Sequence, residues 1–296
     1  IWHHYMYTGE RSFLTDTFDN VQRVIETSKQ YLDADSQLAN VPLWVFIDWA
    51  NIDRDGRNAA FNAIFIGTLE ASARIAGELG RKDRADEYTA LAGKMRANFI
   101  KCYFDQKKGV FVDANKDGKL SKMISEHSNV AAIHFGLSDE KMTAGIIQRL
   151  YEKKTVPYVE ATPFFTAVVL RALDDAGRCD LAVKIIKDRW GKRMVDNGAT
   201  SLYEEWGENG SWRSGHYEGF IRTHSHAWSS APGEFLIKNL AGIKILESGC
   251  RKVQVQPRKV GLDYDVAYPT PLGLIEVTCR KGKISIKADK RIEVVE

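Results

Sequence analysis

The sequence predicts a mainly α-helical fold followed by a small antiparallel β-sandwich domain. From the start of the chain to about residue 240, apolar residues recur at helical spacing in blocks that short polar or Gly-containing turns separate. After Gly242 apolar and polar residues alternate, as in KVQVQP, GLIEVTCRKG and KISIKADK, which is typical of strands. We therefore expect a helical domain over 1–243 and a C-terminal β-domain over 244–296.

About eight helical blocks are expected. The clearest, Asn58 to Leu79 and Asp83 to Phe104, are separated by a Gly80-Arg81-Lys82 stop and predict an antiparallel helical hairpin. Ser, Asp or Thr begins many of the blocks and Gly closes them. The remaining blocks lie near residues 12–33, 121–136, 139–153, 163–176, 178–190 and 226–240.

Successive helical hairpins form either an open solenoid or a closed ring, the (α/α)6 toroid. No fixed repeat of roughly 34 or 40 residues is visible, which disfavours the common helical solenoids. A complete toroid needs more helices than this sequence supplies. We therefore expect an incomplete (α/α)6 toroid with its N-terminal helices missing. The chain also begins inside a helical pattern without a Met, so we expect further chain upstream.

The β-domain is expected to contain turns at Pro269-Thr270-Pro271 and at Lys281-Gly282-Lys283. The four cysteines are far apart and form no CxxC pair, so neither a zinc site nor a disulfide framework is indicated, and we expect buried thiols. They are Cys102, Cys179, Cys250 and Cys279.

The composition is that of an ordinary globular protein, with 44% hydrophobic and 27% charged residues. The net charge is only +3 and the charges are scattered, so we expect no nucleic-acid partner. Seven Trp side chains suit the apolar faces of sugars. We expect a soluble protein, because no segment is long and apolar enough to span a bilayer. The first residues lack the basic and apolar regions of a signal peptide, but with chain expected upstream they do not reveal the compartment, and the oligomeric state also stays open.

The connection WVFIDWANIDRDGRN crowds two Trp, three Asp and two Arg ahead of an apolar helix. Asp48, Trp49 and Asp53 are predicted to line a sugar site, where the carboxylates accept hydroxyl groups and the indole stacks on the ring. The alternative makes Asp53 or Asp55 a capping or turn residue. We adopt that interpretation for Asp55, and we interpret Trp44 as a core anchor.

The segment GATSLYEEWGENGSW places the adjacent Glu204 and Glu205 among aromatic residues. A carboxylate between aromatic walls suits a general base that activates water. The alternative is a solvated pair at a helix start, which the helix dipole favours.

A third segment, THSHAWSSAPGEFL, carries His226 and Trp228 ahead of an apolar helix. Its HxH pair has no further Cys or His at ligand spacing, so we expect a sugar-contacting histidine in preference to a metal site. A structural role for His226 stays open.

DANKDGKL, from Asp113 to Leu120, matches the first positions of a calcium loop, but position twelve is Ile124 and not Glu. We interpret it as a polar hairpin turn. In the nearby SEHSN, Ser125 is expected to cap a helix and His127 to face the binding cavity.

Taken together, these segments resemble the bacterial α-L-rhamnosidases, glycoside hydrolases with an (α/α)6 catalytic domain and a C-terminal β-domain. The likeness lies in Asp48-Trp49, in GATSLYEEW against the family's G-x-T-T-x-W-E-x-W pattern, and in SHAWSSAPGEFLIKNLAGI against its (N/C)-H-x-x-S/G…E-x-L…L-G-I run. VQVQP and YPTPLG are similar to parts of the family's β-domain. Tyr203 and Ser201 depart from the pattern, where the family has Trp and Thr.

The resemblance implies inverting hydrolysis of terminal α-L-rhamnosyl residues by a general acid and a general base. It assigns the base to Glu204, with Glu205 as the second candidate. His226 would hold the sugar or the water, and Trp49, Trp206 and Trp228 would form the walls. No cofactor or metal is expected, since two carboxylates suffice. The resemblance also implies a bacterial protein, from the cytoplasm, the periplasm or outside the cell.

The family's general acid lies in an Arg-Glu segment before the first toroid helices, and this sequence offers no counterpart. We expect the acid upstream, so that the isolated chain is poorly active or inactive. Robust activity of the chain alone would move the acid role to Asp48, Asp53 or Glu160. The alternatives are a toroid hydrolase for another sugar, a non-catalytic carbohydrate-binding protein and a purely structural helical-repeat protein.

Overall fold

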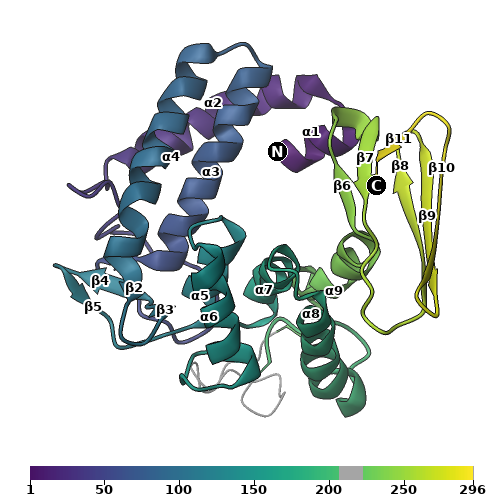
Figure 1. Ribbon diagram of the computed structural model, residues 1–296. Helices are drawn as coiled ribbons and strands as arrows, with labels where there is room; N and C mark the ends of the chain where they lie inside the picture. The colour runs from purple at the N-terminus through teal and green to yellow at the C-terminus, as the bar shows by residue number, and fades with distance from the viewer. Residues whose placement is uncertain (207–222, 296) are drawn as a thin grey trace.

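The computed structural model describes residues 1–206 and 223–295. It has the helical body and the small β-domain that the sequence predicts. Figure 1 shows the helices following one another along an arc, from α2 through the α3–α4 pair and the α5–α6 pair to α7 and α8. The strands β6 to β11 lie at the end of this arc, beside α1.

The helices lie close to their expected positions. Those of the described residues are α1 (Trp2–Thr8), α2 (Arg11–Lys29), α3 (Ala59–Glu78), α4 (Lys82–Tyr103), α5 (Glu126–His134), α6 (Glu140–Ile147), α7 (Pro163–Asp175), α8 (Cys179–Ile186) and α9 (Ala231–Glu234). Single π turns continue three of them, namely η1 (Gln148–Glu152), η2 (Lys187–Gly191) and η5 (Phe235–Asn239). The 226–240 block is divided into η4 (Ala227–Ser229), α9 and η5.

The predicted hairpin of α3 and α4 is confirmed. Asn58 caps α3, because its side chain accepts a hydrogen bond from the backbone N–H of Phe61. Both faces of α3 are buried, since α4 packs on one side and α5 on another. Gly67 permits the close approach to α5: a Cβ at this position would lie 2.2 Å from the Phe135 ring.

The prediction for 121–136 is wrong in its first turn, because α5 begins only at Glu126. Ser121 donates to the carboxylate of Asp53, and Ser125 caps α5 and pairs with Val159 as an isolated bridge. These tertiary bonds keep 121–125 extended. The preceding polar hairpin is confirmed, with β4 (Ala114–Lys116) antiparallel to β5 (Lys119–Leu120).

Three short strands complete the helical body. They are β1 (Arg57–Asn58), which pairs with β4, and β2 (Phe104–Asp105), which pairs with β3 (Val110–Phe111). The pairing of β1 with β4 ties the connection before α3 to the segment between α4 and α5, and β2 and β3 form a hairpin within that segment. The same segment leads into the buried start of α5.

The β-domain consists of two three-stranded sheets. One has the order β10–β9–β8 and is antiparallel throughout; the other has the order β11–β7–β6, in which β11 runs parallel to β7. The predicted turn between β9 and β10 is found at 281–282. The turn between β8 and β9 lies at 271–272, slightly later than predicted, because Pro269 and Thr270 still belong to β8. The strands are β6 (Ile243–Ile245), β7 (Lys252–Val255), β8 (Tyr264–Thr270), β9 (Gly273–Arg280), β10 (Lys283–Ala288) and β11 (Glu293–Val295).

The β-domain has its own core, which Val253, Val255, Ile275 and Val277 dominate. It is joined tightly to the helical body at Gly242, where φ is +67° and a Cβ would lie 1.8 Å from the carbonyl oxygen of Gln256. A side chain therefore does not fit at this junction. All four cysteines are buried and free, as expected.

Candidate active site

The connection between α2 and α3 is held in shape by one side chain. Arg54 donates from Nε to the carbonyl of Val45, and its two terminal nitrogens donate to the carbonyls of Asp48, Ala50 and Ile52. Backbone carbonyls in a partly buried loop need such donors, and the carbonyl of Ala50 also accepts from the N–H of Ile52. The Arg54 clamp thus fixes the backbone on either side of Trp49.

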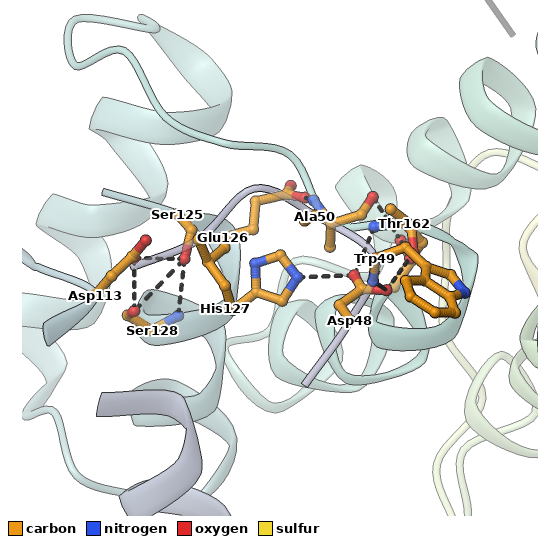
Figure 2. A network of polar contacts seen from close by, with 12 residues as sticks. Asp48, Trp49, Ala50, Asp113, Ser125, Glu126, His127, Ser128 and Thr162 are labelled. Carbon is orange, nitrogen blue, oxygen red and sulfur yellow. Dashed lines mark hydrogen bonds and ion pairs between the residues drawn. The ribbon is translucent and has the colours of Figure 1, made fainter. Parts of the chain in front are cut away.

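Asp48 lies at the meeting point of three chain segments. Its carboxylate is buried and accepts four hydrogen bonds, from the backbone N–H groups of Trp49 (2.9 Å) and Thr162 (2.7 Å), from the Thr162 hydroxyl and from His127 Nε2 (2.7 Å). Thr162 is the residue before α7 and His127 lies in the first turn of α5. One carboxylate therefore ties the connection to two helices (Figure 2).

Glu204 is brought next to Trp49, 155 residues away in the sequence. One carboxylate oxygen accepts a hydrogen bond from the indole N–H of Trp49 at 2.8 Å, and the other accepts from the backbone N–H of Thr223 at 2.9 Å. The carbonyl of Glu204 accepts a hydrogen bond from the Trp228 indole at 2.7 Å. Two donors thus orient the half-buried carboxylate of Glu204, and the Glu204 backbone is bound to Trp228.

An aromatic cluster surrounds this carboxylate. Trp228 stacks on His226 with ring centroids 4.1 Å apart, and it lies 5.0 Å from Phe164 and 6.0 Å from Phe46. Phe46 in turn contacts Trp49 edge-on at 5.1 Å. The structure therefore brings together four of the predicted site residues, namely Trp49, Glu204, His226 and Trp228.

Sequence reasoning missed Phe46 and Phe164. Phe46 lies two residues before Asp48, and its position in WVFIDW is the signal that could have found it. Phe164 follows Pro163, the first residue of α7, and is partly exposed. A helix that starts at a Pro presents its first side chains at the end of the helix, where binding residues often lie.

Glu205 and Trp206 lie on a different side of the segment. Both are buried, and Trp206 packs edge-on against Trp190 at 4.9 Å, with the Arg193 guanidinium over its ring at 5.4 Å. With 6% of its surface exposed, Trp206 is a core residue here, so the wall role predicted for it is not supported. The two adjacent glutamates therefore differ in surroundings. The rest of the predicted segment, 207–212, lies outside the described residues.

Three other predicted residues, Asp53, His127 and Asp48, are not part of the aromatic cluster's surface. Asp53 makes a turn: it accepts hydrogen bonds from the Ser121 hydroxyl at 2.6 Å and from the N–H of Asp55 at 3.0 Å. His127 is fully buried, and so is Asp48. Direct contact of these two with a ligand is therefore not supported, because other residues cover both side chains.

Of the two structural interpretations of the connection, the one for Trp44 is wrong. Trp44 was expected in the core, but 66% of its surface is exposed, and it lies 5.7 Å from Trp49 at the edge of the aromatic cluster. Asp55 caps no helix but lies in a turn, which is the other half of its interpretation: its backbone N–H donates to the Asp53 carboxylate, and its exposed side chain pairs with Lys116. Local composition indicated a buried anchor, whereas the fold leaves this end of the loop at the surface.

A second group of charged residues links the start of α5 to η2. Glu126 is fully buried and accepts hydrogen bonds from Arg189 and from the N–H of Ala161, each at 2.7 Å. Arg189 also lies 3.3 Å from Glu160, which Arg193 binds. Burial alone would raise the pKa of Glu160, but the two guanidinium groups outweigh it and lower the pKa. Glu160 is thus held ionised.

Within residues 1–206 and 223–295, no group of three or more His, Cys, Asp or Glu side chains is arranged to bind a metal. His226 instead stacks on Trp228, and His224 lies against Tyr203 with ring centroids 4.8 Å apart. The helices of the described residues include none that is both long and apolar enough to cross a membrane.

Comparison with known proteins identifies relatives along nearly the whole chain. The family model for the bacterial alpha-L-rhamnosidase six-hairpin glycosidase domain matches residues 1–240. An alpha-L-rhamnosidase of Streptomyces avermitilis is 28% identical over 275 residues, which cover 88% of this chain and 24% of the relative. One of Formosa agariphila is 23% identical, over 86% of this chain and 27% of the relative. The chain thus spans about a quarter of the length of these curated relatives.

Solved structures give the same result. The GH78 family rhamnosidase of Bacillus sp. GL1 superposes with a TM-score of 0.86 at 26% identity, over 99% of this chain and 31% of that one. The S. avermitilis alpha-L-rhamnosidase complexed with L-rhamnose has a TM-score of 0.73 at 21% identity, over 98% and 28% of the two chains, which supports the fold. The incomplete toroid followed by a β-domain is therefore confirmed. The chain belongs to the bacterial α-L-rhamnosidase six-hairpin glycosidase family.

Proposed function

We propose that this chain carries the general-base half of the active site of an inverting α-L-rhamnosidase, with Glu204 as the base. One observation carries the proposal: the Trp49 indole and the Thr223 N–H hold the Glu204 carboxylate beside the aromatic cluster. A base that activates water must present a fixed, ionised oxygen to the reacting centre. Glu205, which is buried, is less suited to this role.

The walls around Glu204 suit a deoxysugar. Trp49, Trp228, Phe46 and Phe164 present apolar faces, on which the methyl group and C–H face of rhamnose would pack. His226 supplies a polar edge for a hydroxyl group. The substrate class follows the family, one member of which was solved in complex with L-rhamnose.

We further propose that the general acid comes from outside this chain. The three carboxylates that were substitute candidates are committed elsewhere. Asp48 accepts four hydrogen bonds, Asp53 binds Ser121, and Glu160 has a lowered pKa between two arginines. A general acid must carry a proton at the working pH, and the two guanidinium groups beside Glu160 favour its ionised form.

The test is time-resolved proton NMR of an aryl α-L-rhamnoside with the complete gene product and with this chain alone. We expect only the complete protein to release rhamnose, and the β-anomer to appear first, because inversion changes the configuration of the α-linked substrate. Initial release of the α-anomer would contradict the mechanism. Cleavage by this chain alone would contradict the external acid.

Glu204→Gln and Glu205→Gln in the complete protein form a matched pair. We expect Glu204→Gln to lower kcat by about 10²- to 10⁴-fold, the usual contribution of a general base. Glu205→Gln should retain more activity. The alternative of a carbohydrate-binding protein predicts a different result. In that case the wild type cleaves no glycoside of a wider panel, and the Glu204→Gln and Glu205→Gln variants still bind L-rhamnose. Cleavage of another glycoside would change the substrate only.

A further inference from the structure

A buried histidine–aspartate pair lies directly beneath the Trp49–Glu204 contact. His127 Nε2 is 2.7 Å from the carboxylate of Asp48, and neither side chain is accessible to solvent. Figure 2 shows the His127 ring pointing from α5 to Asp48, with Thr162 on the far side of the carboxylate. Since an ionised carboxylate only accepts hydrogen bonds, the proton of this contact lies on His127 Nε2.

The pair is connected to Glu204 through one residue. Asp48 accepts the backbone N–H of Trp49 at 2.9 Å, and the indole of the same Trp49 donates to Glu204 at 2.8 Å. The path is therefore His127 to Asp48, Asp48 to the Trp49 backbone, and the Trp49 indole to Glu204. Each step is a directional hydrogen bond, so a displacement of His127 is passed on as a displacement of the indole.

The surroundings of His127 argue against a role in packing alone. Its ring lies against Phe165 at 4.7 Å, in a place that an apolar side chain would fill. Its second nitrogen, Nδ1, is buried and has no hydrogen-bond partner among the described residues. Burying that polar atom costs free energy, which an apolar residue of similar size would avoid. What only the histidine supplies is the hydrogen bond to Asp48.

We propose that Asp48 and His127 are positioning residues that set the orientation of the general base Glu204 through Trp49. This inference rests on the proposed role of Glu204 in catalysis. It replaces the direct sugar contact that the sequence suggested for both residues. Neither touches the substrate, and both act through the indole of Trp49.

The activity experiment compares three variants of the complete protein. His127→Phe keeps the ring volume and removes the donor, so we expect kcat to fall by about 10- to 100-fold with KM nearly unchanged. His127→Gln keeps an N–H donor and should stay within about threefold of the wild type. His134→Gln is the matched control, because it breaks a His–Asp contact at the other end of α5, and we expect no change.

A double variant tests the path. If His127 acts through Trp49, then His127→Phe added to Trp49→Phe should lower kcat no further than Trp49→Phe alone. Losses that multiply in full would overturn the proposal. If His127→Phe does not fold, Thr162→Val serves instead, because it removes the hydroxyl donor to Asp48 at almost the same shape.

A second measurement does not depend on catalysis. The indole N–H signal of Trp49 in the ¹⁵N–¹H spectrum of the complete protein is identified by its loss in Trp49→Phe. We expect it to shift in His127→Phe and to stay in place in His134→Gln. An unchanged signal in His127→Phe, or in Thr162→Val when that variant is the one that folds, overturns the positioning role. Absence of glycosidase activity in the wild type would instead reject the proposed function, and the spectrum would still decide the structural path.

Discussion

The two ends of helix α5 carry the same pair of side chains in opposite settings. At the start of the helix, His127 binds Asp48 at 2.7 Å with both side chains fully buried. At the end, His134 binds Asp175 at 2.6 Å with side chains 27% and 49% exposed. The buried end consists of polar residues, 125–129, whose partners come from the connection before α3, from β3 and from the start of α7.

This difference shows that distance alone does not decide what a polar contact does. Water competes for the exposed pair and dissolved ions screen it, so it contributes little. Around the buried pair no water is available to replace a lost partner, so each bond is needed and fixes a direction. The buried end of α5 is therefore suited to orienting a site. At the exposed end, the Phe135 ring packs against Gly67 of α3, and Arg96 donates to the carbonyl of Phe135.

The largest effect is expected when the buried pair loses its acceptor. Asp48→Asn places an amide among four donors, so at least one N–H is left without a partner. We expect the free energy of unfolding to fall by about 3 kcal/mol, the range for breaking a buried polar pair. Urea unfolding checks this, with Asp175→Asn as the control at the exposed end. Equal losses for the two variants would contradict the comparison.

A smaller loss of stability is expected when the packing at the C-terminal end of α5 is disturbed. Gly67→Ala adds a methyl group 2.2 Å from the Phe135 ring, so α3 and α5 must move apart or the ring must turn. We expect a loss of about 2 kcal/mol, as for other overpacked contacts. Phe135→Leu in the same chain should recover part of it. Full stability of Gly67→Ala would show that this end of α5 is not held by packing.

Acidification tests the charged group behind the buried end. The pKa of Glu160 is lowered because Arg189 and Arg193 outweigh the effect of burial. A lowered pKa in the folded state stabilises the protein above the usual Glu range, and the contribution is lost as pH falls through the lowered value. We expect Glu160→Gln to flatten the decline of the melting temperature on acidification. Parallel curves for wild type and variant would contradict the ion pairing.

The smallest loss of stability is expected when the exposed contact between His134 and Asp175 is broken. His134→Gln removes a contact that solvent already weakens, so we expect a loss of about 0.5 kcal/mol or less. Urea unfolding at low and high salt checks it, since a screened pair should lose even this small contribution at high salt. A loss near that of Asp48→Asn would break the distinction between the two ends.

The helices were largely predictable, because their signals are local. The pattern from Asn58 to Leu79 contains both the cap and the apolar face of α3, and the structure agrees within about one residue. The block at 121–136 failed at its start, since Ser121 and Ser125 bind partners far away in the sequence. The apolar periodicity of the sequence does not reveal such bonds, which keep residues 121–125 out of the helix.

The residues of the candidate site were likewise predictable only in part. The residue types expected of a sugar site were visible in three segments, and three of the predicted residues, Trp49, His226 and Trp228, meet around Glu204. Trp44 and Trp206 were both misjudged, one being exposed and the other buried. The chemical identity of a Trp does not reveal its burial, which depends on what the rest of the chain places against it.

By itself, the sequence determined the helical body, the β-domain and the residue types that a sugar hydrolase needs. Only the tertiary structure showed that Glu204 and Glu205 have different surroundings, and that Asp48 and His127 are buried next to Trp49. The reason is physical: helices and strands follow from interactions within a few residues, whereas a buried hydrogen bond requires two distant segments to exclude water together. The bond from Trp49 to Glu204 spans 155 residues, and no local pattern specifies it.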